Sequence, residues 1–291
     1  MAPHTQVAHP IVPREKLDFG FDQDIPKYWF GGDAFKTRFW DALSVIFPPG
    51  EKFFMTTVRD FRDRVTDAKL LQDIKDFNRQ EAQHTLVHNQ YNDHLRRQGI
   101  DVDFLIKDLD DLLFKKYRSR FSREYTLCIT GALEHFTALG AHTLFDERDL
   151  MKDAHPNVRA MYAWHAIEEV EHKGVAYDVM IDVAKVGYLR RVGALMHATV
   201  MFPYTINRFT NFMLKADGYN WVQRRWLNLK NLPWIIGMAA PILGKYFAYY
   251  KPGYHPWEET EQPGYEPWLK AFNVNRDPVE ASELMRAALV R

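Results

Sequence analysis

Cysteine is almost absent from this chain of 291 residues, which contains only Cys128. A single thiol excludes an internal disulfide framework and a thiolate metal cluster, and it suits a reducing compartment. An excess of one charge is also missing, because 38 Lys and Arg balance 38 Asp and Glu. Without a basic block, nucleic acid is not expected as a partner. The N-terminal segment lacks the cationic start and apolar run of a secretory signal, so we expect a cytoplasmic protein.

Strand-like alternation is lacking as well, and helical periodicity replaces it along most of the chain. The sequence therefore predicts an all-α fold in a single domain, with enough length for a large core. We expect an N-terminal arm over 1–34, a four-helix bundle over 35–187, two apolar helices packed on it over 188–250, and a surface-wrapping tail over 251–291. Within the bundle, we expect Pro48-Pro49-Gly50 to interrupt the first helix, since proline breaks helices. Glu51 would then begin a new segment or lie at a kink.

One short pattern occurs twice in the bundle region. A glutamate is followed, thirty to thirty-five residues later, by a Glu-x-x-His pair, which gives two matching sets: Glu51 with Glu81 and His84, and Glu134 with Glu169 and His172. Residues three apart lie on one helical face, so both side chains of a pair can reach the same ion. Two single carboxylates and two Glu-x-x-His pairs are the layout of a helical bundle that binds two metal ions.

The surroundings of Glu134 support this interpretation, because nearly all its sequence neighbours are apolar or small. An unpaired carboxylate there would cost several kcal/mol, and a divalent cation would remove that penalty. Four carboxylates and two imidazoles without sulfur favour iron, manganese or a mixed pair over structural zinc. We therefore predict two divalent metal ions, with iron preferred.

Further polar residues lie one helical turn from the predicted ligands. His88 follows His84, His165 precedes Glu169, and Glu168 precedes His172. His88 and His165 are either additional ligands or partners that orient the ligands, and the spacing leaves both alternatives open. Glu168 and His165 are also candidates for a catalytic general acid. Glu171 points away from the ligand face, which predicts a solvated or salt-bridged charge.

The helices expected over 188–215 and 221–250 are strongly apolar, but prolines and charged residues interrupt them. Packing on the bundle or a subunit interface, as in a homodimer, is one interpretation. Peripheral contact with the inner membrane face is a second, and a true membrane span is a third, although a span needs about 20 apolar residues.

Three segments resemble a known bacterial family. The Phe-Pro-Pro-Gly-Glu of 47–51, the Gln-Glu-Ala-Gln-His of 80–84 and the Trp-His-Ala-Ile-Glu-Glu-Val-Glu-His-Lys of 164–173 are similar to the family labelled "predicted metal-dependent hydrolase", over roughly residues 15–275. The ligand layout is also similar to the ferritin-like superfamily, which includes ribonucleotide reductase small subunits, monooxygenases, desaturases and ferritins. That resemblance implies a ferritin-like bundle with six ligands, and one or both of Glu81 and Glu169 would bridge the ions. The proline pair before Glu51 and the surplus histidines depart from the superfamily pattern.

The ligand set is compatible with more than one reaction. The favoured prediction is a dinuclear oxidoreductase that activates dioxygen to oxidise a small hydrophobic substrate, with an external electron donor. The alternative is a metal-dependent hydrolase that uses a metal-bound hydroxide. A ferritin-like protein that only binds metal is a second alternative. Because fold does not determine function, the site must decide among them.

Overall fold

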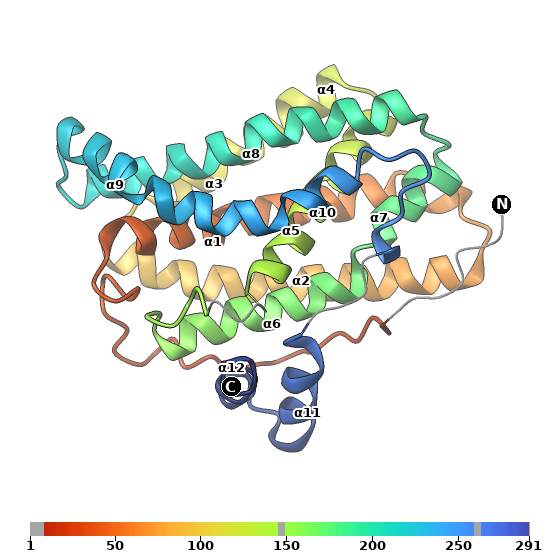
Figure 1. Ribbon diagram of the computed structural model, residues 1–291. Helices are drawn as coiled ribbons and strands as arrows, with labels where there is room; N and C mark the ends of the chain where they lie inside the picture. Colours follow the sequence, from red (N-terminus) through yellow and green to blue (C-terminus); the bar gives the residue numbers. More distant parts are fainter. Residues whose placement is uncertain (1–8, 145–148, 259–262, 291) are drawn as a thin grey trace.

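The computed structural model describes residues 9–144, 149–258 and 263–290. The described residues form helices and loops and include no strand, which confirms the predicted all-α fold. Four long helices form a bundle that lies across the centre of Figure 1: α1 (Ala34–Arg59), α2 (Ala68–Arg97), α5 (Arg123–Leu144) and α6 (Pro156–His172). Asp33 and Asp67 cap the first two by accepting hydrogen bonds from backbone N–H groups of the first turn.

The first bundle helix is continuous, so the predicted interruption at Pro48 and Pro49 is wrong. Proline at position 48 removes the N–H that would bond the carbonyl of Ser44, four residues earlier. The side-chain amide of Asn92 on α2 donates to that carbonyl at 3.1 Å. A neighbouring helix thus satisfies the acceptor that the proline leaves free, and Glu51 lies inside the helix.

Shorter elements join the bundle helices. They are α3 (Val102–Asp110), a π-helical turn (Asp111–Tyr117), α4 (Arg118–Arg120), α7 (Val175–Asp178) and a second π-helical turn (Val179–Val183). Helical periodicity predicts a third bundle helix from Phe121 to about Leu150 and a fourth from Asn157 to about Lys185. In the structure these helices end at Leu144 and His172, and residues 145–148 lie outside the described ranges. Gly174 follows, and a side chain there would meet the indole of Trp257 at 2.3 Å, so glycine permits this close approach.

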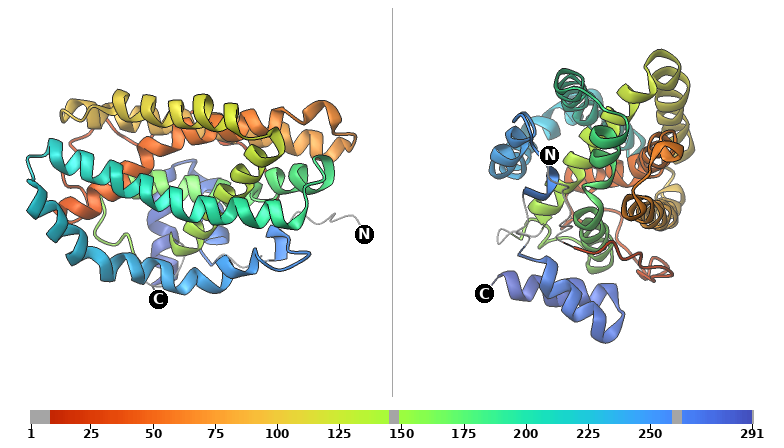
Figure 2. Two further views of the ribbon diagram at one scale, coloured as in Figure 1. Left: turned by 90° about the horizontal axis from the view of Figure 1, so that it is seen from above. Right: turned by 90° about the vertical axis from the view of Figure 1, so that its right-hand side faces the viewer.

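The C-terminal half covers two sides of the bundle. In Figure 1, α8 (Tyr188–Ala216) lies above the bundle, and α9 (Trp221–Ala239) and α10 (Leu243–Ala248) cross in front of it. Below it lie α11 (Tyr265–Asn275) and α12 (Pro278–Leu289). The end-on view in Figure 2 shows the same two flanking groups. The expected surface-wrapping tail therefore contains two helices, whose buried residues include Trp268 and Met285.

The core extends from the bundle into these flanking helices. Fully buried side chains include Phe53, Tyr91 and Trp164 in the bundle and Leu195 and Phe209 on α8, so the inner face of α8 belongs to the same core.

Among the described residues, no helix is long and apolar enough to cross a membrane. Cys128 is buried, and burial raises the pKa of its thiol to about 12, which makes it unreactive at neutral pH.

Candidate metal centre

The structure brings all six predicted ligands together in the middle of the bundle. Each bundle helix contributes: α1 supplies one carboxylate, α5 supplies another, and α2 and α6 each supply a carboxylate and an imidazole three residues apart. None of these side chains is more than 2% exposed, and they are Glu51, Glu81, His84, Glu134, Glu169 and His172. Overlapping groups of three ligand atoms, such as Glu51–Glu81–His84 and Glu81–Glu169–His172, lie within 4.8 Å of one another.

Two of the carboxylates lie between the two histidines. Glu81 places Oε2 3.7 Å from His84 Nδ1 and Oε1 3.4 Å from His172 Nε2. Glu169 does the same, with Oε1 3.9 Å from His84 Nδ1 and Oε2 3.5 Å from His172 Nε2. The remaining carboxylates lie at opposite ends, Glu51 grouped with His84 and Glu134 at 3.5 Å from His172 Nε2. The arrangement has two halves that share Glu81 and Glu169.

A carboxylate orients the first histidine. His84 Nε2 lies 3.1 Å from Glu168 Oε2, so its other nitrogen, Nδ1, faces Glu81 and Glu169. The second oxygen of Glu168 accepts hydrogen bonds from the backbone N–H and guanidinium of Arg14. A carboxylate that holds the outer nitrogen of a histidine leaves the inner lone pair free for an ion.

An amide orients the second histidine, and sequence reasoning did not identify it. His172 Nδ1 lies 2.9 Å from Gln80 Oε1, and Gln80 Nε2 donates to Glu171 Oε2 at 2.7 Å. Because an amide oxygen can only accept, His172 carries its proton on Nδ1, and its Nε2 lone pair faces the carboxylates. Gln80 directly precedes Glu81, but no periodic signal distinguishes it from a surface residue.

The N-terminal arm contacts the carboxylates beside the two histidines. Arg14 is 7% exposed and forms ion pairs with Glu168 at 3.2 Å and Glu171 at 2.7 Å. Tyr265 of α11 donates to Glu171 as well. Of the two alternatives predicted for Glu171, a solvated or a salt-bridged charge, the structure shows the salt bridge. The side chain is also fully buried. Segments far apart in the sequence thus support the histidines of the bundle.

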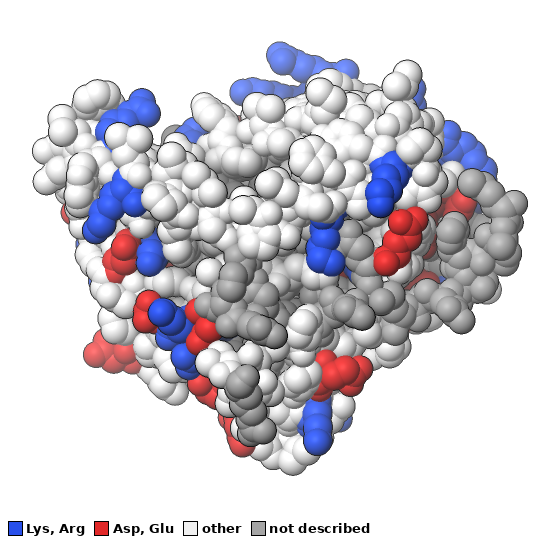
Figure 3. Space-filling model, in the orientation of Figure 1, with Lys and Arg blue, Asp and Glu red and all other residues white. Residues whose placement is uncertain are grey.

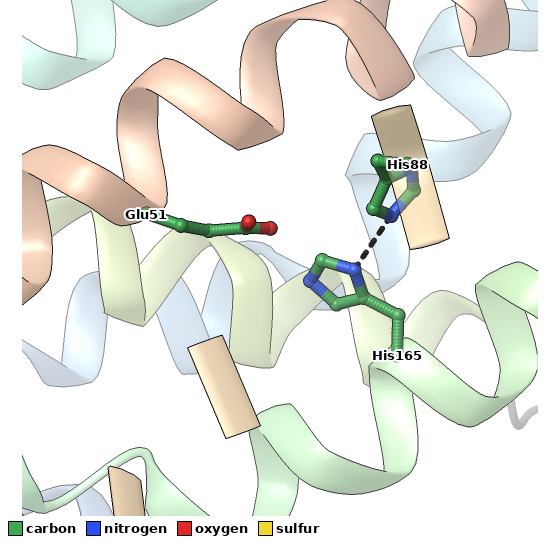
Figure 4. Close-up of side chains that lie close together, drawn as sticks. All are labelled: Glu51, His88 and His165. Carbon is green, nitrogen blue, oxygen red and sulfur yellow. Dashed lines mark hydrogen bonds between the residues drawn. The ribbon is translucent and has the colours of Figure 1, made fainter. Parts of the chain in front are cut away.

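The proline pair and the surplus histidines belong to one hydrogen-bonded chain. Asn92, positioned by the Ser44 carbonyl, accepts from the Ser44 hydroxyl, whose oxygen lies 2.9 Å from His88 Nδ1. His88 Nε2 lies 2.8 Å from His165 Nδ1, as drawn in Figure 4 together with Glu51. His165 Nε2 lies 2.9 Å from Glu169 Oε1.

The donor and acceptor of each hydrogen bond in this series follow from the pair Ser44 and Asn92. Because the Ser44 hydroxyl gives its proton to Asn92, it accepts from His88 Nδ1, and His88 Nε2 then accepts from His165 Nδ1. The lone pair of His165 Nε2 consequently faces the carboxylate of Glu169. Burial and the neighbouring His84 lower the pKa of His165 to about 4, which favours the neutral ring. Two acceptors this close require a proton or a cation between them.

Both nitrogens of His88 are used by hydrogen bonds, which favours an orienting role for it over direct ligation.

The electrostatics of the cluster suit a bound cation. Among the described residues, several of its buried atoms have no hydrogen-bond partner, including both oxygens of Glu81 and Glu134, one each of Glu51 and Glu169, His84 Nδ1 and His172 Nε2. Burial and neighbouring carboxylates raise the pKa of Glu51 and of Glu134 well above the usual value. Burial also opposes ionisation of Glu169, but the neighbouring His172 outweighs it and lowers the pKa of that carboxyl. Oxygen and imidazole donors without sulfur match iron, manganese and similar divalent ions, so the residues present fit the predicted cofactor.

An apolar cavity of about 460 Å³ reaches the cluster from the side of the bundle that α8 and α9 cover. Its inner end is formed by Glu169 and His165, and its walls by aromatic and aliphatic side chains of α1, α5, α8 and α9. Among the described residues that line it there is no Lys or Arg. A second, smaller apolar cavity of about 70 Å³ includes Glu51 in its wall. Sequence reasoning predicted a hydrophobic substrate but not which helices would surround it.

Fold and site together define a helical-bundle protein with a candidate divalent-metal centre. The chain belongs to the family described as predicted metal-dependent hydrolases, whose family model matches residues 13–260. The resemblance found in the sequence is thereby confirmed, and the match includes every residue of the cluster. No curated protein and no solved structure matches the chain. The family description supports metal dependence and the hydrolase alternative, and it gives no support to the favoured prediction of an oxidoreductase.

Proposed function

We propose that the cluster binds two divalent metal ions and that the protein hydrolyses an ester or amide with a hydrophobic acyl group. Glu51 and His84 would hold one ion, Glu134 and His172 the other, and Glu81 and Glu169 would bridge them. When bound, such ions supply Lewis acidity and lower the pKa of a bound water to near neutrality. The family description and the apolar cavity that ends at Glu169 and His165 support the proposal together.

The cavity favours an uncharged acyl substrate. Among the described residues, its lining has aromatic and aliphatic side chains but no cationic side chain, so its walls favour an apolar group over a charged one. Its volume of about 460 Å³ lies within the usual range of ligand pockets, about 300–1,000 Å³. An acyl chain in the cavity would place its carbonyl carbon at the inner end, beside His165 and Glu169.

The two candidate general acids have different surroundings. Glu168 accepts hydrogen bonds from Arg14 through one oxygen and lies 3.1 Å from His84 Nε2 through the other, and it is not among the residues that line the cavity. We assign it a positioning role toward His84. His165 lines the cavity, so it is the better candidate to exchange a proton with water and with the leaving group.

The test uses purified protein loaded with iron, manganese or zinc and a series of p-nitrophenyl esters of increasing chain length. Gly140 lines the cavity, and a Cβ there would meet no atom within 4 Å, so Gly140→Leu should extend into the cavity. We expect this variant to lose activity toward long esters and to retain its metal. Gly193→Leu on α8, also in open space and outside the cavity lining, is the matched control. Equal activity of both variants on long esters would contradict the assignment of the cavity.

Dioxygen-dependent oxidation of the same hydrophobic substrate is the second candidate function. It is favoured by the ligand set, since paired carboxylates and imidazoles without sulfur suit redox-active iron as well as Lewis-acid chemistry. Oxidation also needs an electron donor, whereas hydrolysis consumes only water. Turnover that stops without oxygen and reductant would favour oxidation, and turnover under argon would favour hydrolysis.

A further inference from the structure

The outward face of α9 is apolar along its length. Residues spaced three or four apart on this helix lie on one face and are exposed to solvent: Val222 at 65%, Trp226 at 58%, Leu229 at 70%, Ile236 at 55%, and Pro233 between them. Leu243 and Phe247 of α10 are exposed as well. We call the residues of α9 and α10 in this list the apolar stripe. A surface helix ordinarily turns polar residues outward, so the stripe has the inverse of the usual pattern.

The neighbouring helix continues this surface. Along α8, four large apolar residues at helical spacing are exposed, namely Leu189, Met196, Val200 and Tyr204. Helices α8 and α9 run in opposite directions beside each other, joined by a short turn, and together they cover one side of the bundle (Figures 1 and 2). Contiguous exposed apolar surface of this kind marks a site of interaction with a protein or a membrane.

The charge around the stripe is strongly one-sided. Residues 188–250 contain eight Lys and Arg but one acidic residue, Asp217, in a chain with no net charge. The side chain of Asp217 is buried and paired with Arg38 and Lys27. Basic side chains flank the exposed tryptophans, with Arg225 over the ring of Trp221 and Lys230 over the ring of Trp226. In Figure 3 the upper part of the molecule, where these helices lie, is largely white with several blue and few red side chains.

From these observations we infer that the α8–α10 face docks on an anionic lipid surface. Aromatic and aliphatic residues along one helical face enter the interfacial region of a bilayer, and flanking Lys and Arg attract acidic headgroups. A second copy of this chain is a poorer occupant. A two-fold interface places the same patch on both sides, so the basic residues would face each other without acidic partners.

The apolar cavity opens at the α8–α10 face. Pro203 and Asn207 of α8 and Ala239 of α9 are exposed and also line the cavity whose inner end is Glu169. Its mouth therefore opens between the two helices that bear the exposed apolar residues. In the docked protein an acyl chain could pass from the bilayer into the cavity without crossing water. This last step depends on the proposed hydrolase function, whereas lipid docking does not.

The test measures binding of the full-length protein to sedimented vesicles, either of phosphatidylcholine alone or of equal parts phosphatidylcholine and phosphatidylglycerol. We expect binding to the anionic vesicles that weakens as salt is raised, with a blue shift of tryptophan fluorescence from Trp221 and Trp226. The double variant Trp226→Ser/Leu229→Ser should bind at least tenfold more weakly. Removing Arg225 or Lys230 should weaken binding about fivefold each.

The matched control is Val274→Ser on α11, which removes an apolar residue that is 77% exposed on the opposite side of the bundle. It should bind vesicles like the wild type, and all variants should keep the wild-type Tm and metal content. Three results would overturn the inference: no binding to anionic vesicles, equal binding by the stripe variant, or a wild-type dimer in light scattering that the stripe variant alone converts to a monomer. Hydrolysis of water-soluble esters is measured separately, so loss of docking and loss of the proposed activity can be told apart.

Discussion

Replacing Glu134 by glutamine should change stability in opposite directions with and without metal. The carboxyl of Glu134 is 1% exposed, and neither oxygen has a hydrogen-bond partner among the described residues. Leaving a buried polar group unsatisfied costs about 1–3 kcal/mol. The raised pKa of this carboxyl also means that it binds a proton on folding, which costs stability at neutral pH. Glutamine has the same shape, is neutral without a bound proton, and offers an N–H donor to Glu81 and Glu169. We therefore expect metal-free Glu134→Gln to be more stable than the metal-free wild type by about 1–3 kcal/mol, a rise in Tm of about 2–8 °C.

Metal should favour the wild type instead, by about 2.3 kcal/mol (2.7 minus 0.4), and should reverse the order for any metal-free gain below that value. At a concentration one hundred times the wild-type Kd, binding stabilises the wild type by about 2.7 kcal/mol. A variant that binds a hundredfold more weakly gains only about 0.4 kcal/mol at the same concentration. Scanning calorimetry of both proteins, after chelation and after Mn(II) addition, measures both effects. Glu266→Gln, an exposed carboxylate on α11, controls for loss of charge alone. A metal-free Glu134→Gln that melts below the wild type, together with an unchanged metal-induced shift, would refute the reasoning.

Three further results are expected. Gln80→Leu should weaken metal binding about 10–100-fold, because His172 loses the acceptor that fixes its tautomer, and unchanged affinity in a metal titration would remove that role. The metal-free protein should lose stability in thermal melts as pH rises above about 6.5, the ordinary pKa of histidine. Above that pH, raised pKa values let the folded protein hold protons at Glu51, Glu134, His84 and His172 that the unfolded chain has released, whereas the histidines with lowered pKa no longer titrate. A Tm that rises over this window would contradict the burial of those carboxylates without a cation. Truncation after Gly187 should cause aggregation, since it exposes the core beneath α8, and a monodisperse truncated protein in light scattering would contradict that packing.

The cluster could be predicted from sequence because helical periodicity translates directly into geometry. Residues i and i+3 share a face, so each Glu-x-x-His pair had to point into the same space, and two pairs with two upstream glutamates indicated a bundle around one centre. The structure brings these six residues together. It also places Glu81 and Glu169 between the two histidines, where the resemblance to the superfamily implied bridging ligands.

Interactions between distant segments could not be read from periodicity. The helix continues through Pro48 because Asn92, on another helix, satisfies the free carbonyl of Ser44. Arg14 lies in an arm without regular structure, and only the tertiary fold brings it to Glu168. Each of these contacts depends on how elements pack, and no local pattern in the sequence encodes that packing.

The hydrogen-bonded chain shows how two departures from the expected pattern can have one cause. Pro48 and the surplus histidines His88 and His165 were separate anomalies in the sequence. In the structure the proline frees the carbonyl that positions Asn92, and the chain then runs through both histidines to Glu169. A substitution at Asn92 should therefore affect the metal centre although that residue touches no ligand.

The measurement that tests the account most directly is a metal count after anaerobic loading. Purified full-length protein is incubated with Fe(II) without oxygen, freed of excess metal, and analysed for iron per chain before air is admitted and visible absorption is followed. The account predicts about two ions per chain in the wild type and fewer in His172→Ala, which lacks a proposed ligand. Wild-type protein that binds no metal, or a variant that retains full occupancy, would contradict it.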